Sequence, residues 1–519
     1  MWNTVNASNN KSPRVTVRGE LKERIIINSA RLSAAIYRPS EIYTQDKAGW
    51  PGDWEGRTLL ALVSQWRYNS EPAYVKALVE GLPEHFNERG YLGKIYGPGI
   101  FDEQQLSGHN WLLRGLMEYS MYTGDAVTMQ YAKNIVDRLY KPLRGHYGSY
   151  PTEPEVRGNG GSYSGTITGQ EGGWITSSDI GCAFMCFDAL GQYYALTKDN
   201  EVYCLLAEML EAFEKIDFVE AHMQTHATLS AVRGILNVYV ATGEERFLAA
   251  AIRIFELYEG FGMTENYGNF NWFGRYDTWT EPCAITDSLM VALKLFDITG
   301  KCGYLTAAQR IYYNAFCYAQ RSNGGFGTDT TVGPVVKRLR PSGDGISEAF
   351  WCCTMRGAEG LRTVGDHLFL VNETGELLVT FCENADLDER DYSVTVNSGM
   401  PYEGTVKIEL SIKNPKGNIP KSVKIFDGRE ILKKEFSMID GSHGIVELSI
   451  TPEKHNEPAK YDDGYKVFFG NLLMSQNTEN EQNCNLLPLT NVRDLDDAAI
   501  RRENRKIIFQ EESIERQAD

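Results

Sequence analysis

The sequence predicts a mainly α-helical protein, an (α/α)6 toroid followed by a C-terminal antiparallel β-sandwich. Two observations carry this prediction. Amphipathic helical runs recur in pairs along the first 365 residues, with apolar residues at the three-to-four spacing of a buried helical face. After about Asp366 the apolar residues alternate instead, as they do in β-strands.

Length, composition and charge narrow the function classes. The chain has 519 residues, 42% of them hydrophobic, which is enough to bury a large core in two or three domains. Its net charge of −17 argues against a nucleic-acid partner or an anionic membrane surface. No apolar run approaches the roughly 18 residues of a membrane span, and the start shows no secretory signal. We expect a cytoplasmic protein, or a secreted or periplasmic one if a leader was removed.

The helical runs are joined in pairs by short turns with a Thr-Gly-acid pattern. The run that begins at Leu112 leads through Thr123-Gly124-Asp125 into a second run that ends near Tyr140. Related turns are Thr197-Lys198-Asp199, Thr242-Gly243-Glu244, Thr299-Gly300-Lys301 and, more weakly, Asn69-Ser70-Glu71. With the run near Leu21–Tyr37, this gives about six helical hairpins. Each hairpin must bury its inner face against the next, so the sequence predicts a ring.

The connections between hairpins are long and rich in glycine, at about 145–174, 260–281 and 323–351. Each joins the end of one hairpin to the start of the next, so a closed ring would collect them on one face. Long loops in a compact domain usually carry function. We therefore expect the substrate to bind at this face.

The change in apolar spacing sets the predicted domain limits. Residues 1–365 form the toroid, with a short strand at about 14–18 that joins the sandwich. Residues 366–493 form the β-sandwich, as alternating runs such as Thr405–Ile412 indicate. Residues 494–519 are a charged tail.

Two short motifs on the long loops suit a metal site. Thr280-Glu281-Pro282-Cys283 offers a carboxylate and a thiol, and Trp351-Cys352-Cys353 offers two more thiols. One carboxylate and three thiolates can form a tetrahedral Zn²⁺ site. Ten cysteines in a chain of this length do not indicate a disulfide scaffold, and a disulfide between adjacent cysteines would be strained. The alternative is that these are buried, inert thiols.

These two motifs resemble those of a known family. A Glu-x-Cys followed about 70 residues later by Cys-Cys, within a helical toroid that leads into a β-sandwich, resembles the β-L-arabinofuranosidases of glycoside hydrolase family 127. Further phrases agree, namely Gly19–Arg24, Gly90–Gly93, Gly108-His109, Thr225–Ala227 and Pro401–Val406. The resemblance spans nearly the whole chain, and the Glu-x-Cys and Cys-Cys set is its specific part.

The resemblance implies roles for individual residues. It implies that Glu281, Cys283, Cys352 and Cys353 bind Zn²⁺ and that Cys352 is the nucleophile of a retaining hydrolysis. It also implies a glutamate acid/base about 16 residues before the zinc glutamate, which falls on Glu265. The residues around Glu265 differ from the motif that is usual in the family. The alternative is that Glu265 is a solvated loop glutamate.

The resemblance further implies that His109 and His226 contact the sugar, although histidines beside helices are often structural. The position of a third sugar-binding histidine is occupied by Thr176-Ser177-Ser178-Asp179, and Thr354 follows the cysteine pair where proline is frequent. These departures affect the prediction of the sugar more than that of the metal site.

Three other residues are candidate substrate contacts from their own chemistry. Trp272 and Tyr276 lie on an aromatic-rich loop that would form a stacking wall for a sugar, or else the core of the loop itself. Asp53 is either a polar contact with the sugar or the cap of the helix that follows it.

The sequence therefore predicts a zinc-containing, retaining exo-glycosidase, β-L-arabinofuranosidase-like, that acts on plant-derived oligosaccharides or glycosides. One alternative is a helical-toroid hydrolase or lyase for uronic-acid oligosaccharides with structural cysteines. Another is a non-catalytic carbohydrate-binding protein. A homodimer is an option that the sequence leaves open.

Overall fold

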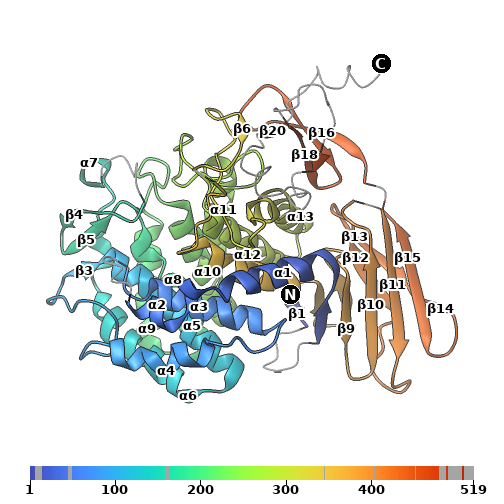
Figure 1. Ribbon diagram of the computed structural model, residues 1–519, viewed down its shortest axis with the longest axis horizontal. Helices are drawn as coiled ribbons and strands as arrows, with labels where there is room; N and C mark the ends of the chain where they lie inside the picture. Colours follow the sequence, from blue (N-terminus) through green and yellow to red (C-terminus); the bar gives the residue numbers. More distant parts are fainter. Residues whose placement is uncertain are drawn as a thin grey trace.

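Helices make up the larger part of the molecule (Figure 1), and their order and contacts arrange them as an inner and an outer ring. The computed structural model describes residues 1–5, 14–44, 50–157, 164–343, 345–402, 404–450, 452–477, 487–488 and 505–507. The inner helices of these residues are α3 (Asp53–Trp66), α5 (Glu103–Thr123), α8 (Phe187–Thr197), α10 (Thr225–Thr242), α12 (Pro282–Thr299) and α15 (Cys353–Asp366). Each contacts the next in this order, and α15 contacts α3, so the inner ring is closed.

An outer helix stands before or after each inner one along the chain. The outer helices are α1 (Gly19–Leu32), α4 (Val75–His85), α6 (Ala126–Ile135), α9 (Asn200–Phe213), α11 (Glu245–Phe261) and α13 (Cys302–Ile311). Three short helices lie in the connections: α2 (Pro39–Thr44), α7 (Pro154–Arg157) and α14 (Cys317–Ala319). The alternation confirms the predicted (α/α)6 toroid.

The Thr-Gly-acid turns are the ends of helices. Gly124, Gly243 and Gly300 follow α5, α10 and α12 with φ angles of 80°, 74° and 68°. A residue without Cβ adopts this left-handed conformation at little cost, which is why glycine closes the helix. The acidic residue can then cap the outer helix, as the Asp125 carboxylate does by accepting a hydrogen bond from the Val127 amide.

The inner helices all run in the same direction through the ring. Each hairpin passes from an inner helix to an outer one through a short turn, and a longer connection returns the chain to the next inner helix. The long connections therefore meet at the end of the ring where the inner helices begin. Two of them contribute a small three-stranded sheet of β3 (Phe101–Asp102), β5 (Trp174–Ser177) and β4 (Ile167–Glu171).

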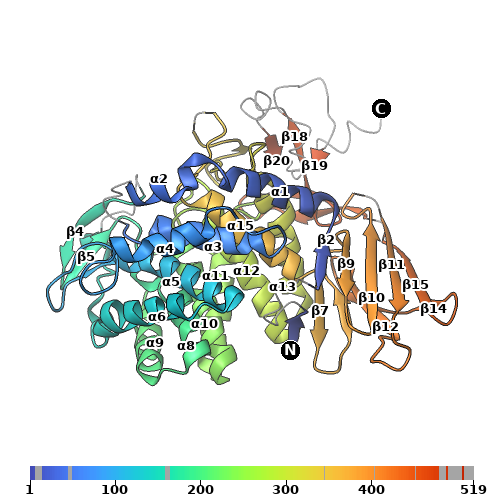
Figure 2. The ribbon, with the colours of Figure 1, turned by 60° about the horizontal axis from the view of Figure 1, so that its bottom comes forward.

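A β-sandwich lies beside the helical rings, as both views show (Figures 1 and 2). One sheet has the order β1 (Trp2–Thr4), β7 (Phe369–Asn372), β8 (Leu377–Val379), β12 (Ser422–Phe426) and β13 (Ile431–Glu435). The other has the order β14 (Ser437–Met438), β15 (His443–Ser449), β11 (Thr405–Ile412), β10 (Tyr392–Ser398), β9 (Ala385–Asp388) and β2 (Val15–Val17). Neighbouring strands are antiparallel except β8 and β12, which are parallel because the chain visits the other sheet between them.

The last described strands form a sheet of their own. β16 (Lys454–Pro458), β17 (Tyr465–Phe469), β18 (Leu472–Asn477) and β20 (Arg505–Ile507) pair in this order with β6 (Arg338–Leu339), and β19 (Leu487–Pro488) pairs with β18. Because β6 belongs to a long loop of the toroid, this sheet ties residues after 450 to the helical part. Most of the predicted tail, 494–519, lies outside the described residues, and the predicted domain limits stay a prediction.

No helix among the described residues combines the length and apolar character needed to cross a membrane.

Candidate functional site

The four predicted metal ligands lie together at the N-terminal ends of two neighbouring inner helices. Glu281 directly precedes α12, and Cys283 lies in its first turn. Cys352 precedes α15, and Cys353 is its first residue. The ligand atoms of the four residues all lie within 4.8 Å of one another. The start of a helix favours negative charge, so thiolates and a carboxylate are stabilised there.

The distances between the sulfurs suit ligands of one metal ion. Cys353 Sγ lies 3.6 Å from Cys283 Sγ and 3.4 Å from Cys352 Sγ. A tetrahedral site with 2.3 Å Zn–S bonds would hold its sulfurs about 3.8 Å apart, whereas a disulfide would bring them to about 2.05 Å. Three thiols and one carboxylate are also donors that zinc accepts. The residues present therefore fit a thiophilic divalent metal ion.

The three thiols are not equivalent. Burial raises the pKa of Cys283 to about 12 and raises that of Cys353 as well. Hydrogen bonds from Cys283 and Cys353 to the Cys352 sulfur lower the pKa of Cys352 in spite of its burial. Cys352 is also the one of the three that is only half-buried. It is thus the thiol that most readily ionises and that a small molecule can reach.

The connections around α12 hold Glu281 in place. The backbone amide of Glu281 donates to Asn269 Oδ1 at 2.8 Å. Asn271, with its amide oriented to suit both neighbours, donates to Glu281 Oε2 at 2.9 Å and accepts from Trp279 Nε1 at 3.2 Å. Gln224, just before α10, also reaches Glu281 Oε2, at 3.5 Å. Burial raises the pKa of the Glu281 carboxyl well above its usual range, which makes a nearby cation favourable.

His226, in the first turn of α10, is hydrogen-bonded to a buried carboxylate. Its Nδ1 is 2.7 Å from Asp287 Oδ2, and its ring stacks on Trp111 at 5.5 Å. Burial favours the neutral form of Asp287, but Arg356, His226 and Arg233 outweigh burial and hold the pKa of this carboxyl far below its usual range. The Asp287 carboxylate accepts from Nδ1, and the other ring nitrogen, Nε2, lies 3.4 Å from Arg57 Nη2.

The structure gives His109 a structural setting. Its Nδ1 lies 2.8 Å from the Gln105 carbonyl oxygen, and its Nε2 accepts a hydrogen bond from the Leu92 amide at 3.0 Å. The ring is fully buried, and burial lowers its pKa to about 4, so it is neutral. Both nitrogens have backbone partners, so a sugar hydroxyl would have to displace one of them. The predicted sugar contact through His109 gains no support from this arrangement.

The aromatic loop is packed rather than open. Trp272 is fully buried and meets Trp279 edge to face at 5.4 Å. Tyr276 is half-buried, with its ring 5.0 Å from that of Phe270 and 5.5 Å from that of Tyr461. Trp272 therefore belongs to the core of the loop, the alternative that the sequence left open.

Two residues near the cluster were not predicted as site residues. Trp351 directly precedes Cys352 and is 52% exposed, so its ring is available for stacking. Asp179 occupies the segment where a third histidine was sought; it is buried, and burial raises its pKa to about 6. The sequence signal for both was their position, beside the cysteine pair for Trp351 and in the substituted segment for Asp179.

Asp53 does not cap its helix with its side chain, since Gly52 is the residue before α3. Instead Asp53 Oδ1 accepts from Arg57 Nε at 2.8 Å, one turn later in the same helix. Arg57 in turn reaches the metal-ligand cluster, because its Nη1 donates to Cys283 Sγ at 3.4 Å. Asp53 is thus linked to the cluster through Arg57.

Glu265 is buried and engaged by residues from the last sheet. Its Oε1 accepts from the backbone amides of Lys460 and Tyr461 at 2.7 and 2.8 Å, and its Oε2 lies 3.1 Å from Lys466 Nζ. The side chain is inaccessible to solvent. The alternative of a solvated loop glutamate, considered from the sequence, is therefore wrong for this residue.

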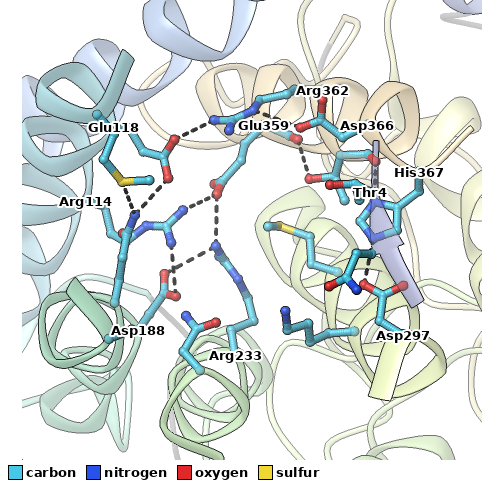
Figure 3. A pocket seen from close by; sticks show the side chains of 18 of the residues that line it. Thr4, Arg114, Glu118, Asp188, Arg233, Asp297, Glu359, Arg362, Asp366 and His367 are labelled. Carbon is cyan, nitrogen blue, oxygen red and sulfur yellow. Dashed lines mark hydrogen bonds and ion pairs between the residues drawn. The ribbon is translucent and has the colours of Figure 1, made fainter. Parts of the chain in front are cut away.

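A pocket of about 440 Å³, shown in Figure 3, lies among the inner helices, away from the thiol cluster. It is lined by residues of the inner helices α5, α8, α10, α12 and α15 and by β1. Its charged side chains pair with one another: Arg114 and Arg233 contact Glu359, and Arg362 contacts Glu118. None of the described residues that line it is a cysteine. Most of its charged side chains are engaged in ion pairs with one another, so the thiol cluster is the better candidate for chemistry.

Comparison with solved structures identifies proteins of the same fold. One, described as a glycoside hydrolase, has a TM-score of 0.63 at 12% identity and covers 92% of this chain and 86% of its own. A GH127 β-arabinofuranosidase has a TM-score of 0.61 at 13% identity, with 90% of this chain and 84% of its own covered. A GH127 β-L-arabinofuranosidase from Geobacillus stearothermophilus T6 has a TM-score of 0.61 at 13% identity, covering 89% and 86%.

No protein-family model and no curated protein matched this sequence. At such low identity the structural likeness establishes the fold, a helical toroid followed by a β-sandwich.

Proposed function

We propose that this protein is a retaining exo-glycosidase of the β-L-arabinofuranosidase type, with Zn²⁺ bound by Glu281, Cys283, Cys352 and Cys353. The observation that carries the proposal is the meeting of these four side chains at the start of α12 and α15, on a fold shared with solved GH127 enzymes. Bound Zn²⁺ supplies Lewis acidity that keeps its thiol ligands ionised at neutral pH.

The half-buried Cys352 sulfur is the nucleophile in this proposal. It attacks the anomeric carbon of the terminal sugar, a C–S bond forms, and the bond to the leaving oxygen breaks. The leaving oxygen takes a proton from an acid and departs as an alcohol. Water, deprotonated by the same group, then attacks the anomeric carbon and returns the electron pair to sulfur. Two displacements give net retention.

Neighbouring side chains would bind and orient the sugar. Trp351, exposed beside Cys352, offers a ring face for stacking. The predicted sugar contact through His226 stays a proposal, because Asp287 and Arg57 already engage its two ring nitrogens. The predicted contacts through Tyr276 and Asp53 stay proposals, and both residues have the protein partners described above.

A panel of substrates tests the function directly. Nitrophenyl glycosides and plant-wall oligosaccharides, incubated with and without a strong zinc chelator, should show release of L-arabinose from β-L-arabinofuranosides that the chelator suppresses. Metal analysis of the same protein should find about one zinc per chain.

A non-catalytic carbohydrate-binding protein is the second candidate, and the engagement of Glu265 by Lys460, Tyr461 and Lys466 favours it. On that reading calorimetry would detect oligosaccharide binding, while no member of the panel would be cleaved.

Glu265→Gln separates a catalytic from a structural role of Glu265. If Glu265 is the acid/base, we expect hydrolysis of oligosaccharides to fall by about 10²–10⁴-fold, with a much smaller loss for dinitrophenyl glycosides, whose leaving group needs no proton. Steady-state kinetics with both substrates measure this difference.

Lys466→Met is the matched control, since it removes the ion pair with Glu265 and keeps the carboxyl. It should change the two substrates alike. An equal loss for both substrates in Glu265→Gln, together with a lower Tm, would assign Glu265 to holding the last sheet on the toroid.

A further inference from the structure

Arg57 joins the proposed metal centre to three other groups of the site. From the second turn of α3 its guanidinium donates to Cys283 Sγ at 3.4 Å and to Asp53 Oδ1 at 2.8 Å. Its Nη2 lies 3.4 Å from His226 Nε2, and the group sits 4.1 Å from the centre of the Trp111 ring. The side chain is 5% exposed. The guanidinium is therefore held by groups inside the protein and not by the solvent.

The charge of the cluster calls for a cation at this place. With all four ligands ionised, three thiolates and one carboxylate carry four negative charges, and a divalent ion cancels two of them. Excess charge in a buried site is unfavourable unless it is paired and hydrogen-bonded. Arg57 supplies a positive charge in direct contact with a ligand sulfur. Arg356, the other arginine on the Trp111 ring, is paired with Asp287 instead.

We propose that Arg57 is a positioning residue that compensates the charge of the metal centre and orients the Cys283 sulfur, so that it sets the affinity of the cluster for zinc. This inference rests on the metal centre in the proposed function. It assigns Asp53 a supporting role, since the Asp53 carboxylate fixes the guanidinium that reaches Cys283.

The shape of the guanidinium explains why arginine fits this position. Its planar fork directs separate N–H groups to Asp53, Cys283 and His226, while its face lies on Trp111. A lysine ammonium at the same place would keep the charge, but it would be a single point without the fork or the stacking face. Charge and orientation can therefore be separated by substitution.

The affinity of the intact protein for zinc, measured by competition with a chromogenic chelator, tests the inference. Arg57→Met should weaken zinc binding by about 10- to 100-fold, the range found for groups that support metal ligands. Arg57→Lys should recover part of the loss because the charge returns. Asp53→Asn should weaken binding less than Arg57→Met, but in the same direction.

Arg114→Met is the matched control, because Arg114 is equally buried in the inner ring but pairs with Asp188 and Glu359, away from the thiol cluster. It should leave zinc affinity unchanged. Thermal unfolding of the metal-free proteins separates affinity from stability, and Arg57→Lys and Asp53→Asn decide the matter if Arg57→Met does not fold.

Two outcomes would overturn the inference, and they differ in what else they affect. If the unaltered protein binds zinc tightly and the Arg57 and Asp53 variants bind it equally well, Arg57 does not set the affinity and the metal centre stands. If the unaltered protein binds no zinc, both the metal centre and the role of Arg57 are wrong.

Discussion

Replacing Cys352 by alanine is expected to lower kcat/KM for the cognate glycoside by at least about 10⁴-fold, because the group that attacks the anomeric carbon is removed. Cys352 is the half-buried member of the cluster, and its neighbours Cys283 and Cys353 lower its pKa. The measurement is steady-state hydrolysis by protein whose zinc content and circular dichroism have been determined, since Cys352 is also a proposed ligand.

Cys182→Ala is the matched control for Cys352→Ala. Cys182 is a fully buried thiol in the toroid, 3.8 Å from Glu103 Oε2, and it is not part of the cluster. Its substitution should leave the activity close to that of the unaltered protein. Full hydrolysis by Cys352→Ala would rule out the sulfur nucleophile, and a loss that merely follows a lower Tm would reduce Cys352 to a structural residue.

Removal of zinc is expected to have the second large effect. A strong chelator should abolish hydrolysis and lower Tm, and added zinc should restore both. Zinc that binds only the folded chain stabilises it by about 2.7 kcal/mol when free zinc is 100 times its Kd, and chelation removes this contribution. Glu281→Ala should have a related effect through the loss of one ligand, with zinc content falling well below one per chain.

Glu103→Gln is the control for Glu281→Ala. Glu103, like Glu281, is a carboxylate at the start of an inner helix, but it is fully buried and pairs with Arg157 at 2.7 Å. Its substitution should lower the free energy of unfolding and leave the zinc content unchanged. If the unaltered protein contains no zinc and its Tm does not respond to a chelator, a metal centre at Glu281 is contradicted.

The helical part of the fold could be predicted from local signals. The Thr-Gly-acid turns are visible in the sequence because glycine after α5, α10 and α12 must adopt a positive φ angle, and an acidic side chain such as Asp125 can cap the next helix. Each helical hairpin must bury its apolar inner face against the next hairpin. About six such hairpins in a row therefore predict a closed ring. The separate last sheet was not predicted, since β6 and β20 are distant in the sequence and pair only in space.

The cysteine cluster could be predicted for a different reason. Three thiols and a carboxylate on two long loops suited a metal site, with buried, inert thiols as the alternative, and the family resemblance grouped the four residues before any distance was known. Arg57 carried no such signal, because an arginine inside an amphipathic helix most often pairs with a neighbouring acid. Its contact with Cys283 depends on α3 and α12 lying in the same ring.

The sequence by itself determined the period of each segment, the turns between helices and the residue types available for chemistry, since these depend on neighbours along the chain. Only the tertiary structure decided which polar groups are already occupied. Both ring nitrogens of His109 have backbone hydrogen-bond partners, and the Glu265 carboxylate accepts from the Lys460 amide. The Asp53 carboxylate accepts from Arg57. The reason is that a buried polar group must find a partner. For Glu265 that partner is the Lys460 amide, which only folding brings near it.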